Sequence, residues 1–222
     1  MRFNLKQTSF SLLILLFASL TLVSCKEKTK KLKLDIPMEV ELYRFDKAFA
    51  EATPSDLEQL KTDFPMFFDP SLEDSFWYEK MQDTLQIELQ TEVLKQFSDI
   101  TPIKEDIKSV FQYAKHYFPQ FEAPVVYTST TDVAFETKVI YNPPFMVIGL
   151  DNYLGGDHHF YEGIQLFFTQ NMNIERLPVD VAQELAMHFI APPTDRTFLS
   201  QILAYGKLLY FAEHFVPEAS EQ

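Results

Sequence analysis

The sequence predicts an α+β domain that is mainly helical, in which helices pack around a small antiparallel or mixed sheet of three strands. Three observations support this fold class. Apolar residues recur at helical spacing in the first half of the chain and again near its end. Between these regions lie three short stretches rich in Val, Ile, Tyr, Phe and Thr. The chain has a single cysteine, so its fold has to rest on an apolar core and not on disulfides.

The N-terminal segment has the pattern of a secretory signal. Arg2 and Lys6 precede the uncharged stretch FSLLILLFASLTLVS, which is short for a bilayer span of about 20 residues. It ends in LVSC, residues 22–25, which resembles the lipobox of bacterial lipoprotein precursors. In such precursors the cysteine is lipidated and becomes the first residue after cleavage. We therefore expect residues 1–24 to be a signal peptide and Cys25 a lipidation site. An ordinary signal peptide or a membrane anchor that contains a cysteine by chance is the alternative.

The next segment, residues 25–39, is rich in lysine and poor in apolar side chains, and we expect it to be a tether. From about Val40 the composition becomes aromatic and acidic, so residues 40–222 are expected to form a single α+β domain. The formal net charge of −13 repels the phosphates of nucleic acids and anionic lipid surfaces. Nucleic acid is therefore not expected as a partner, and membrane contact is expected only through the anchor and the lysines.

The first half of the domain is expected to be helical. Short helices are predicted at 45–52 and 55–64, separated by Thr53-Pro54. A longer helix of about five turns follows, because apolar residues recur at every fourth position (Met81, Leu85, Leu89, Val93, Phe97). Thr101 and Pro102 form a capped helix start, and the apolar stripe of this helix continues until Pro119.

Three strands are predicted next, at 123–130, 132–141 and 144–151, with breaks at Thr131-Asp132 and at Asn142-Pro143-Pro144. Their short connections favour an antiparallel or mixed sheet over βαβ crossovers. Two further helices are predicted, one from Pro178 to about Ile190 and one from Pro192 to about Phe215. The last helix is apolar nearly all round, so we expect it to be buried.

The stretch LDNYLGGDHHFY, residues 150–161, is the best candidate for a metal site on composition. His158 and His159 are adjacent, however, so their rings point to opposite faces of a strand or lie about 100° apart on a helix. Asp157 and His159 offer two ligands, but a third would have to come from His116, His188, His214 or a carboxylate, none at a recognised spacing. We expect no metal site and no cofactor here.

A second candidate is the predicted helix at 178–190, in which Glu184 stands where a zinc-peptidase helix has its general base. That chemistry requires two histidines four residues apart on one face, and these positions hold Gln183 and Met187. His188 lies about 100° from the required face. We therefore expect this helix to be an amphipathic core helix. The sequence contains no G-x-S-x-G elbow and no glycine-rich phosphate loop that would indicate another catalytic chemistry.

The stretch 150–161 is therefore interpreted as structural. Gly155-Gly156 supplies positive φ for a tight turn, and Asp151 or Asp157 can cap a turn or a following helix. The apolar and aromatic members of the stretch (Tyr153, Leu154, Phe160, Tyr161) are expected to pack against neighbouring helices.

Several short motifs together resemble the GldB family, gliding-motility lipoproteins of Bacteroidota. They are, in order, the lipobox, YRFD, FPMFF, Trp77, YFP, LDNYLGGDHHFY and GKLLY. The resemblance implies an envelope lipoprotein needed for gliding and associated with the motility and type IX secretion apparatus, with no established enzymatic activity. It also implies a distant likeness to zincins, and hence a degenerate zincin-like domain. Members of the family usually continue beyond GKLLY, so the resemblance also implies that this chain lacks the family's C-terminal part, which would leave the last helix partly uncovered.

We thus expect a lipid-anchored, non-enzymatic component of the gliding machinery that acts by protein contact. Lys26, Glu27 and Lys28 lack the aspartate that often retains lipoproteins in an inner membrane, which favours the outer membrane. Two alternatives stay open. One is a metal-dependent hydrolase using His158 or His159 with Glu184, and the other is a carrier of a small envelope ligand, suggested by the aromatic content.

Overall fold

The computed structural model describes residues 34–193 and 195–216. The predicted signal peptide, Cys25 and most of the predicted tether lie outside these residues. In chain order the elements are β1 (Leu42–Arg44), α2 (Phe45–Glu51), η1 (Pro54–Asp56), α3 (Leu57–Asp63), η2 (Pro65–Phe67), α4 (Asp74–Gln82), α5 (Thr84–Gln96), α6 (Thr101–Tyr117), β2 (Val125–Ser129), β3 (Val139–Asn142), β4 (Phe145–Gly149), η3 (Leu150–Asn152), η4 (His159–Tyr161), α7 (Leu166–Thr169), η5 (Ile174–Arg176), α8 (Leu177–Phe189) and α9 (Phe198–Phe215).

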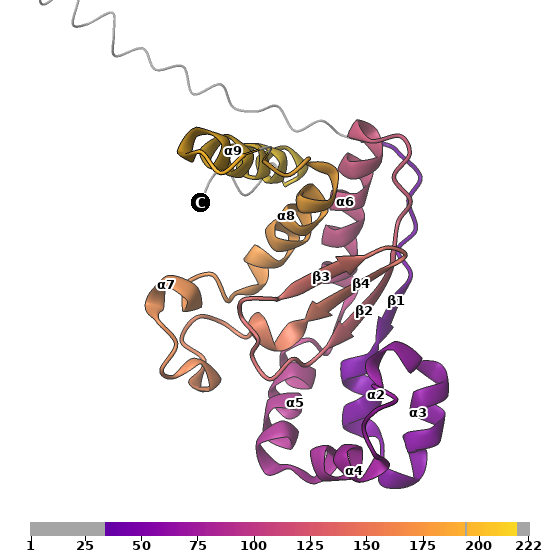
Figure 1. Cartoon of the computed structure of the whole chain (residues 1–222). Coiled ribbons are helices and arrows are strands. Elements are labelled where there is room, and N and C mark those ends of the chain that lie inside the picture. Colours follow the sequence, from indigo (N-terminus) through magenta and orange to yellow (C-terminus); the bar gives the residue numbers. More distant parts are fainter. Residues whose placement is uncertain (1–33, 194, 217–222) are drawn as a thin grey trace, which may run out of the picture. The chain divides into compact units, whose positions relative to one another are not determined.

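The elements form a mainly helical α+β fold around one small mixed sheet, which confirms the predicted class (Figure 1). The sheet has four strands in the order β1-β2-β4-β3, so the prediction of three strands was wrong. β1, β2 and β4 are parallel, and β3 pairs antiparallel with β4. β1 was missed because it has only three residues, too few to show a period, and its partner is more than 80 residues away in the sequence.

One face of the sheet is buried beneath α6 and α8 (Figure 1). Val126, Met146 and Ile148 point into this side and are fully buried in the larger of two apolar cores. The opposite face carries aromatic rings that are only partly covered. There Tyr43 stacks on Tyr127, with 5.6 Å between ring centroids, and the Tyr127 ring meets Phe64, which packs on a smaller aromatic core.

The smaller core is formed by α2, α3, α4 and the segments between them. Its buried members are Phe45, Phe49, Leu57, Leu60, Phe68 and Trp77. Aromatic pairs hold these elements together, among them Phe68 and Trp77 with ring centroids 4.7 Å apart. The YRFD motif anchors this core to the sheet, because buried Asp46 accepts hydrogen bonds from Arg44 and from Thr128 of β2.

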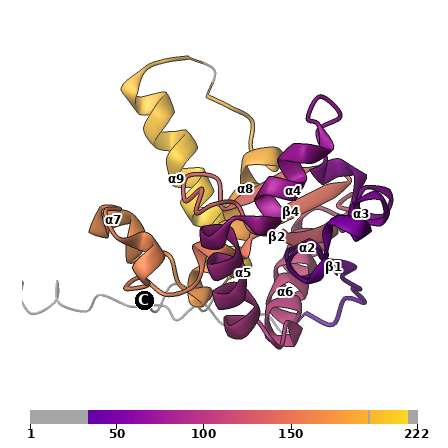
Figure 2. The same ribbon diagram turned by 90° about the horizontal axis from the view of Figure 1, so that it is seen from below.

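Two helix predictions need correction. The single helix expected across Met81–Phe97 is split at Asp83, which has an extended backbone and separates α4 from α5. The last helix begins at Phe198 and not near Pro192, and most of its apolar side chains are exposed, whereas we expected it to be buried. Only one side of its C-terminal half reaches the core, through Phe211, Ala212 and Phe215. Figure 2 shows the first half of α9 projecting past α8.

No helix within residues 34–193 and 195–216 is long and apolar enough to cross a bilayer.

Candidate functional site

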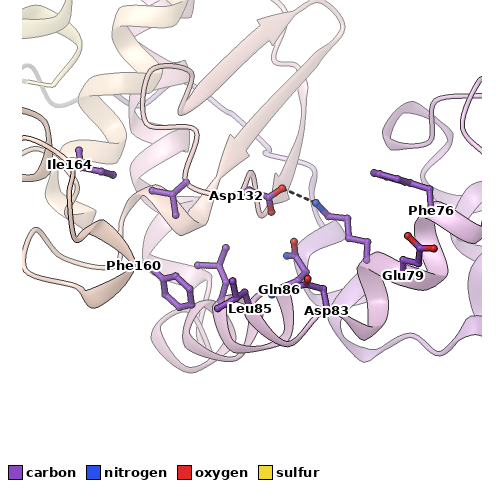
Figure 3. Close-up of a pocket in the computed structure, with 11 residues that line it drawn as sticks. Phe76, Glu79, Asp83, Leu85, Gln86, Asp132, Phe160 and Ile164 are labelled. Carbon is purple, nitrogen blue, oxygen red and sulfur yellow. Dashed lines mark hydrogen bonds and ion pairs between the residues drawn. The ribbon is translucent and has the colours of Figure 1, made fainter.

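A groove of about 690 Å³ lies between α4, α5, the loop before β3, and η4 with the segment after it (Figure 3). Its size falls in the range of ligand and peptide pockets. Apolar side chains stand at both ends, Phe76 at one and Phe160 with Ile164 at the other, and charged groups lie between them (Figure 3). The complete lining is Phe76, Glu79, Lys80, Asp83, Leu85, Gln86, Leu89, Asp132, Val133, Phe160 and Ile164.

The floor of the groove results from the break between α4 and α5. Asp83 caps α5, since its carboxylate accepts the Gln86 backbone N–H at 2.9 Å. Because α5 is a new helix that begins after this cap, its first turn lies at the groove, and its following turns pack into the core. Leu85 is therefore 66 % exposed, although the four-residue period predicted it to be buried, and Leu89 is only 4 % exposed.

One wall is a strained loop. Asp132 and Val133 both have positive φ, 55° and 58°. This conformation disfavours a β-branched residue such as valine and costs on the order of 1–3 kcal/mol. The loop is held by Asp151 of the LDNYLGGDHHFY stretch. Its fully buried carboxylate accepts the backbone N–H of Thr131 at 2.9 Å and that of Val133 at 2.7 Å.

Burial raises the pKa of the Asp151 carboxyl group, and the hydrogen bonds from Val133 and Thr131 offset part of that rise. The sequence predicted that Asp151 or Asp157 caps a turn or a helix. In the structure the Asp151 carboxylate caps a loop about 20 residues earlier in the chain, so its main partners lie across the fold.

The other wall is the end of the same stretch. Buried Tyr161 donates a hydrogen bond from its hydroxyl to the Asp151 carbonyl oxygen at 2.7 Å and accepts one from the Leu154 N–H at 2.9 Å. Gly155 has a φ of 111°, as predicted for a tight turn. Gly156 does not have positive φ; it is required because a Cβ there would lie 2.7 Å from the Thr169 carbonyl oxygen. Tyr153, Leu154 and Tyr161 are buried, as expected. Phe160 is only half-buried, because it lines the groove.

The two histidines of the stretch face carboxylates of α5. His159 Nε2 lies 3.1 Å from Glu88 Oε1, and His158 Nε2 lies 3.6 Å from Glu92 Oε2. Within the described part of the chain, no three His, Cys, Asp or Glu side chains are grouped as a metal site requires. The histidine pair instead fastens η4 to α5.

The α8 positions that resembled a peptidase helix have other partners. Glu184 accepts the Tyr141 N–H at the edge of the sheet at 3.2 Å, and burial raises the pKa of its carboxyl group. Gln183 accepts a hydrogen bond from Arg176, and Met187 is 56 % exposed. Glu184 thus faces β3 while His158 and His159 face α5, so the structure does not bring together the residues of the hydrolase hypothesis.

The groove is acidic. Asp132 pairs with Lys80 at 2.9 Å, which leaves the carboxylates of Glu79 and Asp83 without a cation among the described residues. Gln86 is buried, and its side-chain amide donates a hydrogen bond to the Thr130 hydroxyl at 3.2 Å. Two carboxylates, Glu79 and Asp83, thus lie in the lining between apolar side chains at either end.

A family model described as "Gliding motility protein GldB", whose short name abbreviates lipoprotein, matches residues 25–222. The chain belongs to the GldB family. It is therefore a protein related to gliding motility. No curated protein and no solved structure matches the chain. The described residues give no support to the zincin-like character that the resemblance implied.

Sequence reasoning found the residues of the LDNYLGGDHHFY stretch but not the groove that they help to build. Two signals mark it. One is Asp83, a capping residue inside an apparently continuous apolar stripe, and the other is Asp132 before a β-branched residue in a stretch rich in strand formers. Cys25, the one residue predicted to carry chemistry, lies outside the described residues.

Proposed function

We propose that this GldB family member is a lipid-anchored envelope protein that is required for gliding and works by contact with the motility and type IX secretion machinery. Membership of the family over residues 25–222 carries the proposal. The matched region begins at Cys25, the residue to which the lipobox pattern assigns the lipid. The lack of an inner-membrane aspartate after Cys25 supports an outer-membrane location.

Contact, and not catalysis, is proposed because of the way the signature stretch is used. Asp151, Tyr161 and the two histidines position the walls of an open groove, and each of the four has a structural partner in the fold. A protein that works by recognition needs such a rigid, shaped surface.

The test is deletion of the gene in the source organism, complemented by the intact gene and by Cys25→Ala, with single-cell gliding scored under the microscope. We expect gliding to be lost in the deletion and restored by the intact gene only. Labelling with a palmitate analogue should mark the intact protein and not Cys25→Ala. Normal gliding of the deletion strain would refute the motility role, and gliding of an unlabelled Cys25→Ala strain would refute the need for the anchor.

A Glu184→Gln strain separates this proposal from the hydrolase alternative. Because Glu184 only accepts a backbone N–H in the structure, the amide can replace it, and we expect normal gliding. Loss of gliding at unchanged protein level, together with stoichiometric metal in the purified chain, would favour the hydrolase.

A further inference from the structure

We infer that the groove binds an extended peptide segment of a partner protein in which a basic side chain lies between apolar ones. This inference rests on the proposed function, since it names the chemistry of the contact by which the protein works. The groove itself is defined by the eleven lining residues given above.

The charges that line the groove indicate that the central part of the ligand is basic. Glu79, Asp83 and Asp132 face the groove against a single cation, Lys80, which is already paired with Asp132. Glu79 belongs to α4 and Asp83 to its connection to α5, and both line the groove. An arginine or lysine side chain placed there meets two carboxylates for which the described part of the chain supplies no cation, whereas an acidic side chain is repelled.

Apolar side chains, exposed at one end of the groove and half-buried at the other, indicate what the two ends of the ligand carry. Phe76 is 43 % exposed at one end, and Leu85, on the floor, is 66 % exposed. Phe160 and Ile164 form the other end (Figure 3). Apolar groups stand at both ends of a charged centre, exposed at the Phe76 end and half-buried at the Phe160 and Ile164 end. They match an extended chain with alternating properties better than a compact cation, which would leave one end uncovered.

Rigidity supports a role in recognition. The Asp132–Val133 wall is kept in an unfavourable backbone conformation by Asp151, and η4 is fastened by Tyr161 and the histidine pair. Backbone strain of this kind persists only where the surrounding structure enforces it, and it clusters at binding sites. A preformed wall also reduces the entropy lost when a peptide binds.

The test uses the full chain purified in detergent and a fluorescent peptide, Phe-Ser-Arg-Ser-Arg-Ser-Leu. Two matched peptides carry Glu for Arg, or Ser for Phe and Leu. We expect binding of the first peptide, weakening as salt screens the charges, and about tenfold weaker binding of either matched peptide. Equal binding of all three peptides, or of none, would overturn the inference.

Variants locate the binding. Glu79→Gln with Asp83→Asn removes both charges while Asn keeps the cap of α5, and Leu85→Gln changes an exposed side chain of the floor. Each should weaken binding by about tenfold, whereas Glu122→Gln, at an exposed carboxylate outside the groove, should not. Full affinity in the groove variants would overturn the site. A tenfold gain on replacing the lysines of residues 26–33 by serine would mean that the chain's own segment occupies the groove, and would overturn a partner peptide.

The same groove variants in the gliding assay separate the two proposals. If the deletion stops gliding but the groove variants glide normally, the motility role stands and the inference fails. If the deletion glides normally while the peptide binds as expected, the motility role fails and the groove remains a peptide site.

Discussion

A single buried carboxylate organises the candidate site. Among the described residues no cation pairs with Asp151, and its carboxylate accepts hydrogen bonds from the N–H groups of Thr131 and Val133. Removing such an acceptor would leave two donors unsatisfied at a strained turn, which costs on the order of 1–3 kcal/mol for each group. The hydrogen bond to Asp151 of the LDNYLGGDHHFY stretch thus offsets the free energy needed to keep Val133 at positive φ.

Asp151→Asn should destabilise the chain at neutral pH, and the gap to the natural chain should widen as the pH falls. Burial raises the folded-state pKa of Asp151 above its ordinary value of 3.8, so the folded state binds the proton more tightly than the unfolded state. The natural chain therefore gains stability as the pH falls through that raised pKa, and the asparagine variant, which does not titrate, does not. Urea unfolding of both chains between neutral pH and about pH 4 measures the gap.

Asp56→Asn provides the opposite control. Hydrogen bonds from Thr53 lower the pKa of exposed Asp56, so its contribution is lost only as the pH falls below 3.8 through the folded-state pKa. Its gap to the natural chain should stay constant over the range in which that of Asp151→Asn widens. A constant gap for Asp151→Asn would contradict the role given to burial.

Helices and strands could be predicted wherever the apolar period of the sequence persists. The predictions were wrong where a capping residue or a distant contact interrupts that period. α6 and α8 follow their apolar stripes closely. The stripe from Met81 to Phe97 gave one helix because spacing does not show that Asp83 caps a second one. The stretch 132–141 was predicted as strand from its composition, but only Val139–Asn142 pairs, because the buried Asp151 turns the chain at Asp132. The interruptions that sequence reasoning missed are the ones that build the groove.

The two halves of α9 should respond differently to truncation of a phenylalanine. Phe215 is 2 % exposed and packs on Phe211, with 3.9 Å between ring centroids, so Phe215→Ala should cost about 3–5 kcal/mol. Phe198 is 81 % exposed, so Phe198→Ala should change the free energy of unfolding by less than about 0.5 kcal/mol. Chemical denaturation of the two variants measures the difference. A large loss for Phe198→Ala would show that the first half of α9 is covered in solution.

On the scale of the whole domain, the groove lies where the two apolar cores meet. α4 contributes Trp77 to the smaller core and Phe76, Glu79 and Lys80 to the groove. The opposite walls belong to the larger core, through Val133 and the segment around Tyr161. The Lys80–Asp132 ion pair joins the two sides, and a partly exposed pair of this kind contributes no more than about 1 kcal/mol. A ligand that contacts both walls would therefore couple the two cores.

The smaller core should open at lower denaturant than the larger one, because only six buried apolar side chains form it. Trp77 is the only tryptophan of the chain and lies in that core, so its fluorescence reports the smaller core selectively. We expect the urea midpoint of Trp77 fluorescence to precede that of far-ultraviolet circular dichroism.

A chain with Trp77→Phe and Tyr117→Trp provides the control. Its new tryptophan would stack near Phe215 in the larger core, so we expect the midpoint of its fluorescence to coincide with that of the dichroism. Adding the arginine peptide should move the Trp77 midpoint towards the second transition, because a ligand stabilises the state that binds it. Coincident midpoints in the free protein would mean that the two cores unfold as one cooperative unit.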